Sequence, residues 1–109
     1  MKFFKILRDI EGTCYHEFYK GRWQDGKYWN AQSIFLHDDE LFAELEELLY
    51  YTISDYDPYS NVEVNRKDWD KVVEKAKEKG GKTYTIISEA NNWAENVFAE
   101  HDVFTILGI

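Results

Sequence analysis

The chain has 109 residues, a net charge of −8 and a sequence pI near 4.8. A chain of this length builds one modest core, so we expect a single domain over residues 1–109. Its hydrophobic content of 44% and aromatic content of 17% exclude a disordered chain, and its acidity disfavours binding to nucleic acid through the phosphates.

Three further features of the composition bear on location and class. The single cysteine, Cys14, cannot form an internal disulfide, which favours a reducing, cytoplasmic setting. No apolar run approaches the roughly 18 residues of a membrane span, and Lys2 and Lys5 interrupt the apolar start of the chain, so we expect neither a span nor a secretory signal. The chain also lacks a glycine-rich phosphate-binding loop.

The first third of the chain predicts three strands. Aromatic and β-branched residues over 2–7, and again over 13–23, are typical of strands. Asp25-Gly26 is a favoured two-residue hairpin turn because both positions tolerate positive φ. The chain should then return as a third strand over 27–36.

The expected hairpin has a defined register. A two-residue turn places Trp23 opposite Tyr28 and Arg22 opposite Trp29, and such aromatic pairs stabilise a sheet by roughly 0.2–1 kcal/mol. The alternation of side chains along 13–23 further predicts that one side of this strand faces water.

The next segment predicts a helix over about 39–53. Its apolar residues recur at helical spacing and form one inward stripe, namely Leu41, Phe42, Leu45, Leu48 and Leu49. Asp38 is a plausible N-cap, and Asp39 and Glu40 complement the helix dipole in the first turn. The composition of 54–61 predicts a loop after the helix.

The second half of the chain predicts a short strand over 62–64 and a helix over 66–79. Asn65 should cap this helix, with Trp69, Val72, Val73 and Ala76 facing inward, and Gly80-Gly81 should end it. Residues 83–87 fit either a strand or a helix, and we expect a short strand there that leads into a helix over 88–100. A final apolar strand over 103–109 should lie inside the sheet.

Together these elements predict an α+β fold. We expect a mainly antiparallel sheet of about four to five strands, with an N-terminal hairpin and a C-terminal strand, packed with about three helices.

The negative charge is concentrated in one segment. Residues 28–65 hold nine acidic residues and no Lys or Arg, whereas the rest of the chain holds 12 acidic and 13 basic residues. Concentrated charge of one sign steers an oppositely charged partner, although charge runs often serve only to keep a helix face solvated. Tyrosines accompany these acids, and tyrosine is favoured at protein interfaces. The candidate partner-binding residues are Asp38, Asp39, Glu40, Glu44, Glu46, Glu47, Tyr50, Tyr51, Asp55, Tyr56, Asp57 and Tyr59.

Catalytic and metal-binding patterns are weak. Cys14 and His16 share one face of a strand, and His37 or His101 could in principle join them, but no Cys-x-x-Cys or His-x-x-x-His occurs. Asp55-Tyr56-Asp57 opens like a calcium loop but lacks its central glycine and terminal glutamate. We therefore expect no enzyme activity, no metal and no cofactor.

The acidic, tyrosine-rich stretch from Asp38 to Tyr59, in a short α+β chain without a catalytic signature, resembles the small bacterial immunity proteins, including those of contact-dependent growth inhibition systems. The resemblance implies a cognate toxin as partner, often a nuclease, with no direct contact to nucleic acid or membrane. Two alternatives are a small cytoplasmic enzyme or metal-binding protein using Cys14, His16 or His101, and an acidic adaptor or DNA-mimic subunit that binds a host protein.

Overall fold

The computed structural model describes residues 1–24 and 26–108, and within these it does not describe the side chains of Glu40 and Leu41. The elements in chain order are η1 (Leu7–Asp9), β1 (Tyr15–Lys20), β2 (Ile34–His37), α1 (Glu40–Thr52), β3 (Asn61–Asn65), α2 (Arg66–Lys79), α3 (Gly81–Phe98) and β4 (Val103–Leu107). The predicted α+β class is confirmed, with three α-helices and a four-stranded antiparallel sheet in the described residues.

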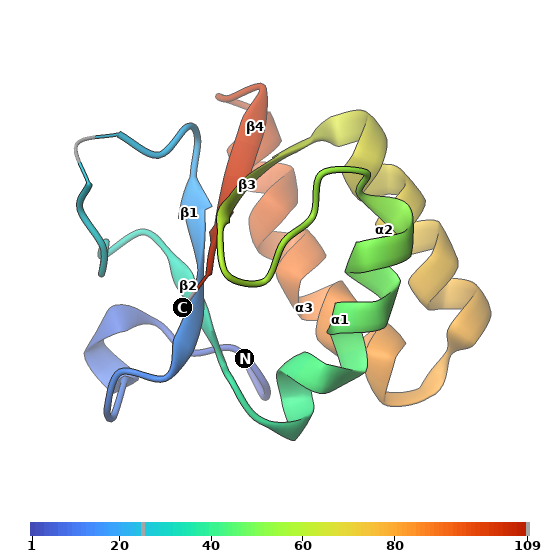
Figure 1. Cartoon of the computed structure of the whole chain (residues 1–109), viewed down its shortest axis with the longest axis horizontal. Helices are drawn as coiled ribbons and strands as arrows, with labels where there is room; N and C mark the ends of the chain where they lie inside the picture. Colours follow the sequence, from blue (N-terminus) through green and yellow to red (C-terminus); the bar gives the residue numbers. More distant parts are fainter. Residues whose placement is uncertain (25, 109) are drawn as a thin grey trace.

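The last strand of the chain lies inside the sheet. The strand order is β2-β1-β4-β3, so β4 pairs with β1 on one side and β3 on the other (Figure 1). Ile106 is the register partner of both Phe18 and Val62, and every residue of β4 is buried. The apolar C-terminal segment was therefore interpreted correctly as an internal strand, and the predicted strand at 62–64 is confirmed as β3.

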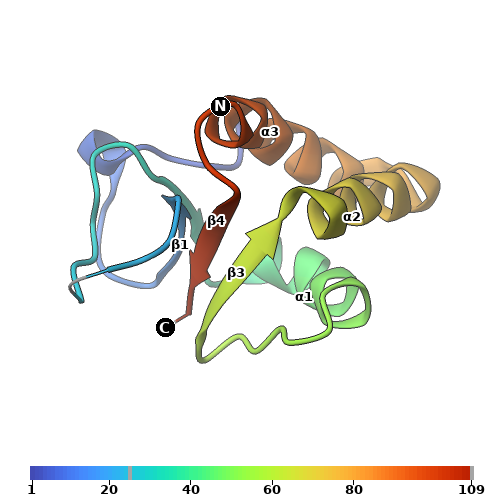
Figure 2. The same cartoon turned by 90° about the horizontal axis from the view of Figure 1, so that it is seen from above.

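The three α-helices cover one side of the sheet, and the connection between β1 and β2 lies on the other side (Figure 2). Phe104 of β4 is at the centre of the core. The centroid of its ring lies 5.7 Å from that of Phe18, 5.2 Å from that of Trp69 and 5.4 Å from that of Trp93. These distances are typical of favourable aromatic pairs, so β1, α2 and α3 are all fixed to the central strand.

Helix α2 begins and ends as its sequence predicts. The Asn65 side chain accepts a hydrogen bond of 2.8 Å from the backbone N–H of Asp68, which is an N-cap. The helix buries Trp69 and stops at Gly80, whose φ of 67° is a conformation that glycine adopts without strain. In the described part of the chain, no helix combines the length and the apolar character that crossing a membrane requires.

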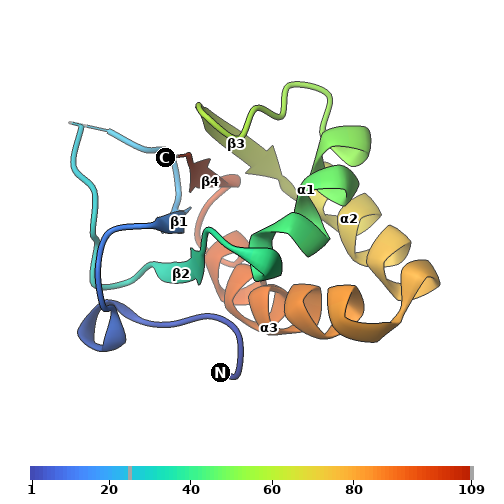
Figure 3. The same cartoon turned by 60° about the horizontal axis from the view of Figure 1, so that its bottom comes forward.

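The predicted strand at 2–7 is wrong. Only Lys5 forms a β-bridge, to Phe35 on the edge strand β2, and the chain then turns into η1. The backbone N–H groups of residues 2–4 instead donate to the carboxylate of Glu89 on α3, at 2.9–3.1 Å. Figure 3 shows the N-terminal segment running past β2 toward α3. The carboxylate of Glu89 thus accepts the hydrogen bonds that a neighbouring strand would otherwise accept from these backbone N–H groups.

The N-terminal hairpin is confirmed as the β1–β2 pair, but its connection is much longer than two residues. Strand β2 begins only at Ile34, so residues 21–33 form a long loop, and Asp25 of the expected turn lies outside the described residues. The rings of Trp23 and Tyr28 do contact each other, at 5.0 Å between centroids, but inside this loop and not as a strand pair.

The loop covers the side of β1 that was expected to face water. Glu17 is only 3% exposed, and its carboxylate accepts hydrogen bonds from the backbone N–H of Trp29 (2.7 Å), the backbone N–H of Asn30 (3.0 Å) and the hydroxyl of Ser33 (2.6 Å). Tyr15 on the same side is buried as well. The prediction of a solvated side is therefore wrong, because three donors from the loop allow a carboxylate to be buried.

The predicted strand at 83–87 is also wrong, because α3 begins at Gly81 and continues through this segment. Its buried residues keep helical spacing from the start, including Thr83, Ile86, Ile87 and Ala90. The hydroxyl of Thr85 donates to the carbonyl of Gly81, four residues earlier. Packing of an apolar stripe thus outweighs the β propensity of this segment.

Candidate functional site

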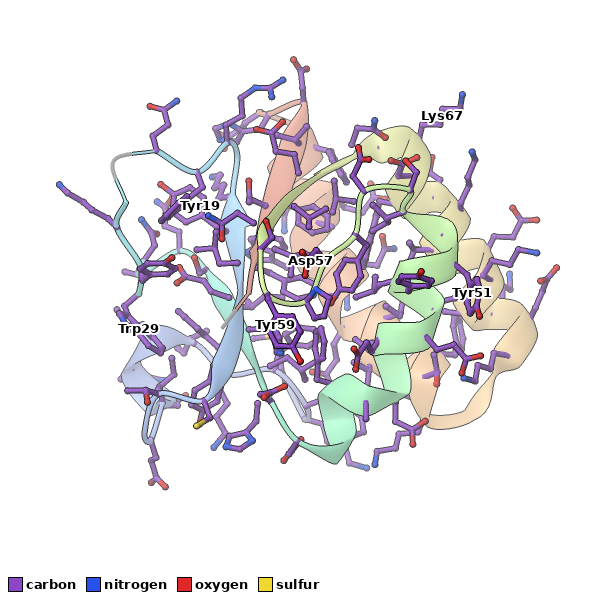
Figure 4. All side chains as sticks on the ribbon, in the orientation of Figure 1. Tyr19, Trp29, Tyr51, Asp57, Tyr59 and Lys67 are labelled. Carbon is purple, nitrogen blue, oxygen red and sulfur yellow. The ribbon has the colours of Figure 1, made fainter. Side chains whose placement is uncertain are left out.

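Helix α1 and the loop after it present acidic and tyrosine side chains on one surface. Three residues of the expected stripe, Phe42, Leu45 and Leu49, are buried in the core, and Leu48 packs against it partly buried. The side chain of Leu41, the fifth residue of the stripe, lies outside the described residues. Its other side exposes Tyr50 and Tyr51, which are 61% and 78% exposed. Tyr51 on α1, and Asp57 and Tyr59 on the loop, lie on the side of the molecule seen in Figure 4.

Most carboxylates on this surface have no cationic partner among the residues that the structure describes. Among the described residues, five acids of α1 and the loop form no ion pair: Glu44, Glu46, Glu47, Asp55 and Asp57. By contrast, Glu63 on β3 pairs with Arg22 at 2.7 Å. We define the acidic surface as these five acids together with the exposed Tyr50, Tyr51 and Tyr59. Glu44 lies at its margin, half-buried with Oε2 3.5 Å from the hydroxyl of Thr83 on α3, and Asp55 lines a second pocket together with Arg22.

Two acids before α1 are engaged within the protein. Oδ1 of Asp38 lies 2.9 Å from Nε2 of His16, and Oδ2 of Asp39 lies 3.2 Å from Nδ1 of His37. His16 is 1% exposed and its ring stacks on Phe42, with 3.5 Å between centroids. Burial lowers the pKa of His16 although Asp38 favours the charged form, so the imidazole is neutral at pH 7. These acids are therefore part of the protein's own packing.

The remaining predicted site residues differ in their surroundings. Tyr59 is 81% exposed, whereas Tyr56 is only 6% exposed and belongs to the core. The side chain of Glu40 lies outside the described residues. The sequence pattern could not separate the buried tyrosine of the loop from the exposed one.

Tyr56 forms part of a pocket in the acidic surface. The pocket has a volume of about 320 Å³ and is lined by Glu46, Glu47, Tyr50 and Tyr51 of α1 and by Tyr56 and Pro58 of the loop. The hydroxyl of Tyr56 is buried and has no hydrogen-bond partner among the described residues. Burial raises the pKa of this hydroxyl, and the charge of Glu46 raises it further. Sequence reasoning did not include Pro58, which lies between Asp57 and Tyr59, among the site residues.

The residues of the alternative catalytic or metal site are not brought together. His16 is buried, Cys14 is exposed just before β1, and His101 packs against Gly21 just after the end of β1. A six-residue strand spans about 20 Å, so Cys14 and His101 lie too far apart to act on one ligand. No group of three or more His, Cys, Asp or Glu suited to a metal ion occurs within residues 1–24 and 26–108.

Comparisons of the chain with protein-family models, with curated proteins and with solved structures found no significant match.

Proposed function

We propose that this protein is an immunity-type inhibitor that acts in the cytoplasm by binding and neutralising a basic protein toxin, with a nuclease as the expected partner. The observation that carries the proposal is the acidic surface itself. Its five carboxylates have no ion-pair partner in the described part of the chain, and three exposed tyrosines lie among them. A surface that served only for solubility would not need three large aromatic side chains exposed to water.

The two kinds of side chain would contribute differently to binding. Unpaired carboxylates attract a cationic surface over distances of about 8–10 Å at ordinary salt concentrations, which accelerates association. Tyrosines bury a large area at low entropic cost, which slows dissociation. Carboxylates are also suited to a nuclease, because they can take the place of the phosphates that its cationic site binds.

The acidic surface is held on a rigid support. Phe42, Leu45 and Leu49 fix α1 to the core, and Tyr56 fixes the loop. A surface that is already ordered loses little conformational entropy on binding, so more of the contact energy appears as affinity.

The experiment uses the protein encoded by the gene adjacent to that of this chain, which the proposal predicts to be basic. Isothermal titration calorimetry would compare the natural protein with the variant E44K/E46K/E47K and with D70K/E74K/E78K, which changes the net charge equally on exposed positions of α2. We expect the first variant to weaken binding by about 100-fold or more and the second by much less, because close charge pairs are worth roughly 1.5–7 kcal/mol. Equal binding by all three proteins would contradict the proposal.

A further inference from the structure

The pocket between α1 and the following loop has the chemistry of a site for a single cationic side chain. Two carboxylates, those of Glu46 and Glu47, meet three tyrosines there, and neither carboxylate forms an ion pair with a described residue. Its volume of about 320 Å³ is at the lower end of the range of roughly 300–1,000 Å³ typical of ligand pockets. The pocket therefore suits one long side chain better than a large ligand.

Tyr56 supplies an independent indication that the pocket is incomplete without a ligand. It is 6% exposed, it lines the pocket, and its hydroxyl has no hydrogen-bond partner in the described ranges. Buried polar groups in proteins are almost always paired, so this unpaired hydroxyl marks a place where a hydrogen-bond partner is expected. Glu46 is close enough to raise the pKa of this hydroxyl, which places the two oxygen groups in the same electrostatic environment.

The exposed aromatic rings select the type of cation. The rings of Tyr50 and Tyr51 stand at 89° to each other with 5.3 Å between centroids, so they present a ring face next to a ring edge. A guanidinium group stacks on aromatic faces and donates up to five hydrogen bonds in a planar fork, whereas an ammonium is a compact and more strongly hydrated charge. Arginine is also enriched among the residues that dominate binding energy at protein interfaces.

We propose that this pocket receives one arginine side chain of the basic partner, whose guanidinium donates to the carboxylate of Glu46 and stacks against the exposed tyrosines. The hydroxyl of Tyr56 is enclosed in the free protein, so the guanidinium reaches it only when the pocket opens on binding. The assignment rests on the proposed function, since the partner that carries the arginine is the neutralised protein. The arginine would be one binding residue of the interface, and the remaining charges of the acidic surface would accelerate association with the partner.

The test uses nuclear magnetic resonance on the full chain with acetyl-arginine methylamide as the probe. The uncharged analogue acetyl-citrulline methylamide is the matched control, because it has nearly the same shape without the charge. We expect the arginine probe to shift resonances of Glu46, Glu47, Tyr50, Tyr51 and Tyr56 saturably, and the citrulline probe to leave them unchanged.

Two variants separate the pocket from general acidity. E46Q/E47Q should weaken the arginine probe by about tenfold or more, whereas E74Q/E78Q, with the same charge change on α2, should leave it unaltered. Y56F keeps the buried ring but removes the acceptor, so it should weaken the probe by about fivefold. Equal shifts with both probes, or an affinity that E46Q/E47Q does not change, would overturn the assignment.

The magnetic resonance experiment and the calorimetric experiment test different claims, so either claim can be wrong while the other stands. If the neighbouring basic protein binds the acidic surface but the arginine probe does not bind the pocket, the arginine assignment is wrong and the proposed function stands. If the probe binds as expected but the neighbouring protein does not, the pocket is a guanidinium site and the proposed partner is wrong.

Discussion

His16 and Asp38 are joined across the fold, with Nε2 of the buried imidazole 2.9 Å from Oδ1 of the half-exposed carboxylate. The pair connects the core strand β1 to the residues that lead into α1. Because the ring of His16 also stacks on Phe42, the start of α1 and the acidic surface beyond it are fixed to the sheet.

The stability of the protein should fall as the pH drops below about 6.5. Burial lowers the pKa of His16 in the folded state, whereas the unfolded chain keeps a value near 6.5. Below that value the unfolded state binds more protons than the folded state, so the free energy of unfolding decreases as the pH falls. Urea unfolding at several values between about pH 5 and pH 8 measures this slope.

The variant H16F isolates this contribution, because phenylalanine keeps a flat ring against Phe42 but cannot bind a proton. The pH dependence of its unfolding free energy should be flatter between about pH 5 and pH 7 than that of the natural protein. Parallel curves for the two proteins would show that His16 does not titrate differently on folding.

Glu17 should be essential for the loop that covers the sheet opposite the helices. Its buried carboxylate accepts three hydrogen bonds, and E17Q replaces one acceptor oxygen with a donor facing other donors. We expect E17Q to lower the free energy of unfolding by about 1–3 kcal/mol, the cost of an unsatisfied buried group. S33A removes only one of the three bonds and should cost about 1 kcal/mol. An E17Q protein as stable as the natural one would refute this role.

Gly108 holds the loop of the acidic surface close to the end of β4. A Cβ atom at this position would lie 2.5 Å from the carbonyl oxygen of Pro58 and 2.8 Å from the backbone nitrogen of Ser60. G108A must therefore displace the loop, and we expect a loss of about 1–3 kcal/mol in the free energy of unfolding. Thermal and urea unfolding measure the loss, and resonances of Tyr56 should shift with it. An unchanged free energy of unfolding for G108A would show that the loop moves aside without loss of stability, which would contradict the prediction.

Tyr50 and Tyr51 should affect binding without affecting folding. Both are exposed, so the double variant Y50A/Y51A should change the free energy of unfolding by no more than about 0.5 kcal/mol per site. The dissociation rate of the basic partner should rise by about tenfold or more, since exposed tyrosines at interfaces commonly contribute over 1 kcal/mol. Y84A, which removes a half-exposed tyrosine from α3, is the matched control and should leave the dissociation rate unchanged.

The sequence predicted those elements whose signals are local. The apolar stripe of α1, the Asn65 cap of α2 and the apolar run of β4 each reflect one helix turn or one strand, and each prediction is confirmed. In these segments propensity, hydrophobic period and capping agree with the tertiary packing.

The parts that could not be predicted depend on contacts between distant residues. The N-terminal segment departs from a strand because Glu89, 85–87 residues away, binds its backbone. The start of α3 was missed because β-branched residues that face the core suit a strand and a helix equally well at short length. Tyr56 is buried and Tyr59 is exposed although the loop gives them similar neighbours, since only the path of the backbone decides which ring meets the core.

The most direct test of the account is the association rate of the neighbouring basic protein, measured by stopped flow as a function of salt concentration. For the natural protein and for D70K/E74K/E78K, we expect a fast rate that falls steeply as salt is added, because unpaired carboxylates on α1 and its loop steer the encounter. For E44K/E46K/E47K, the rate should be at least about tenfold slower at low salt and nearly independent of salt. If the two triple variants slow association equally, only the net charge of the protein affects association. The claim that the negative charge is concentrated on one binding surface would then be wrong.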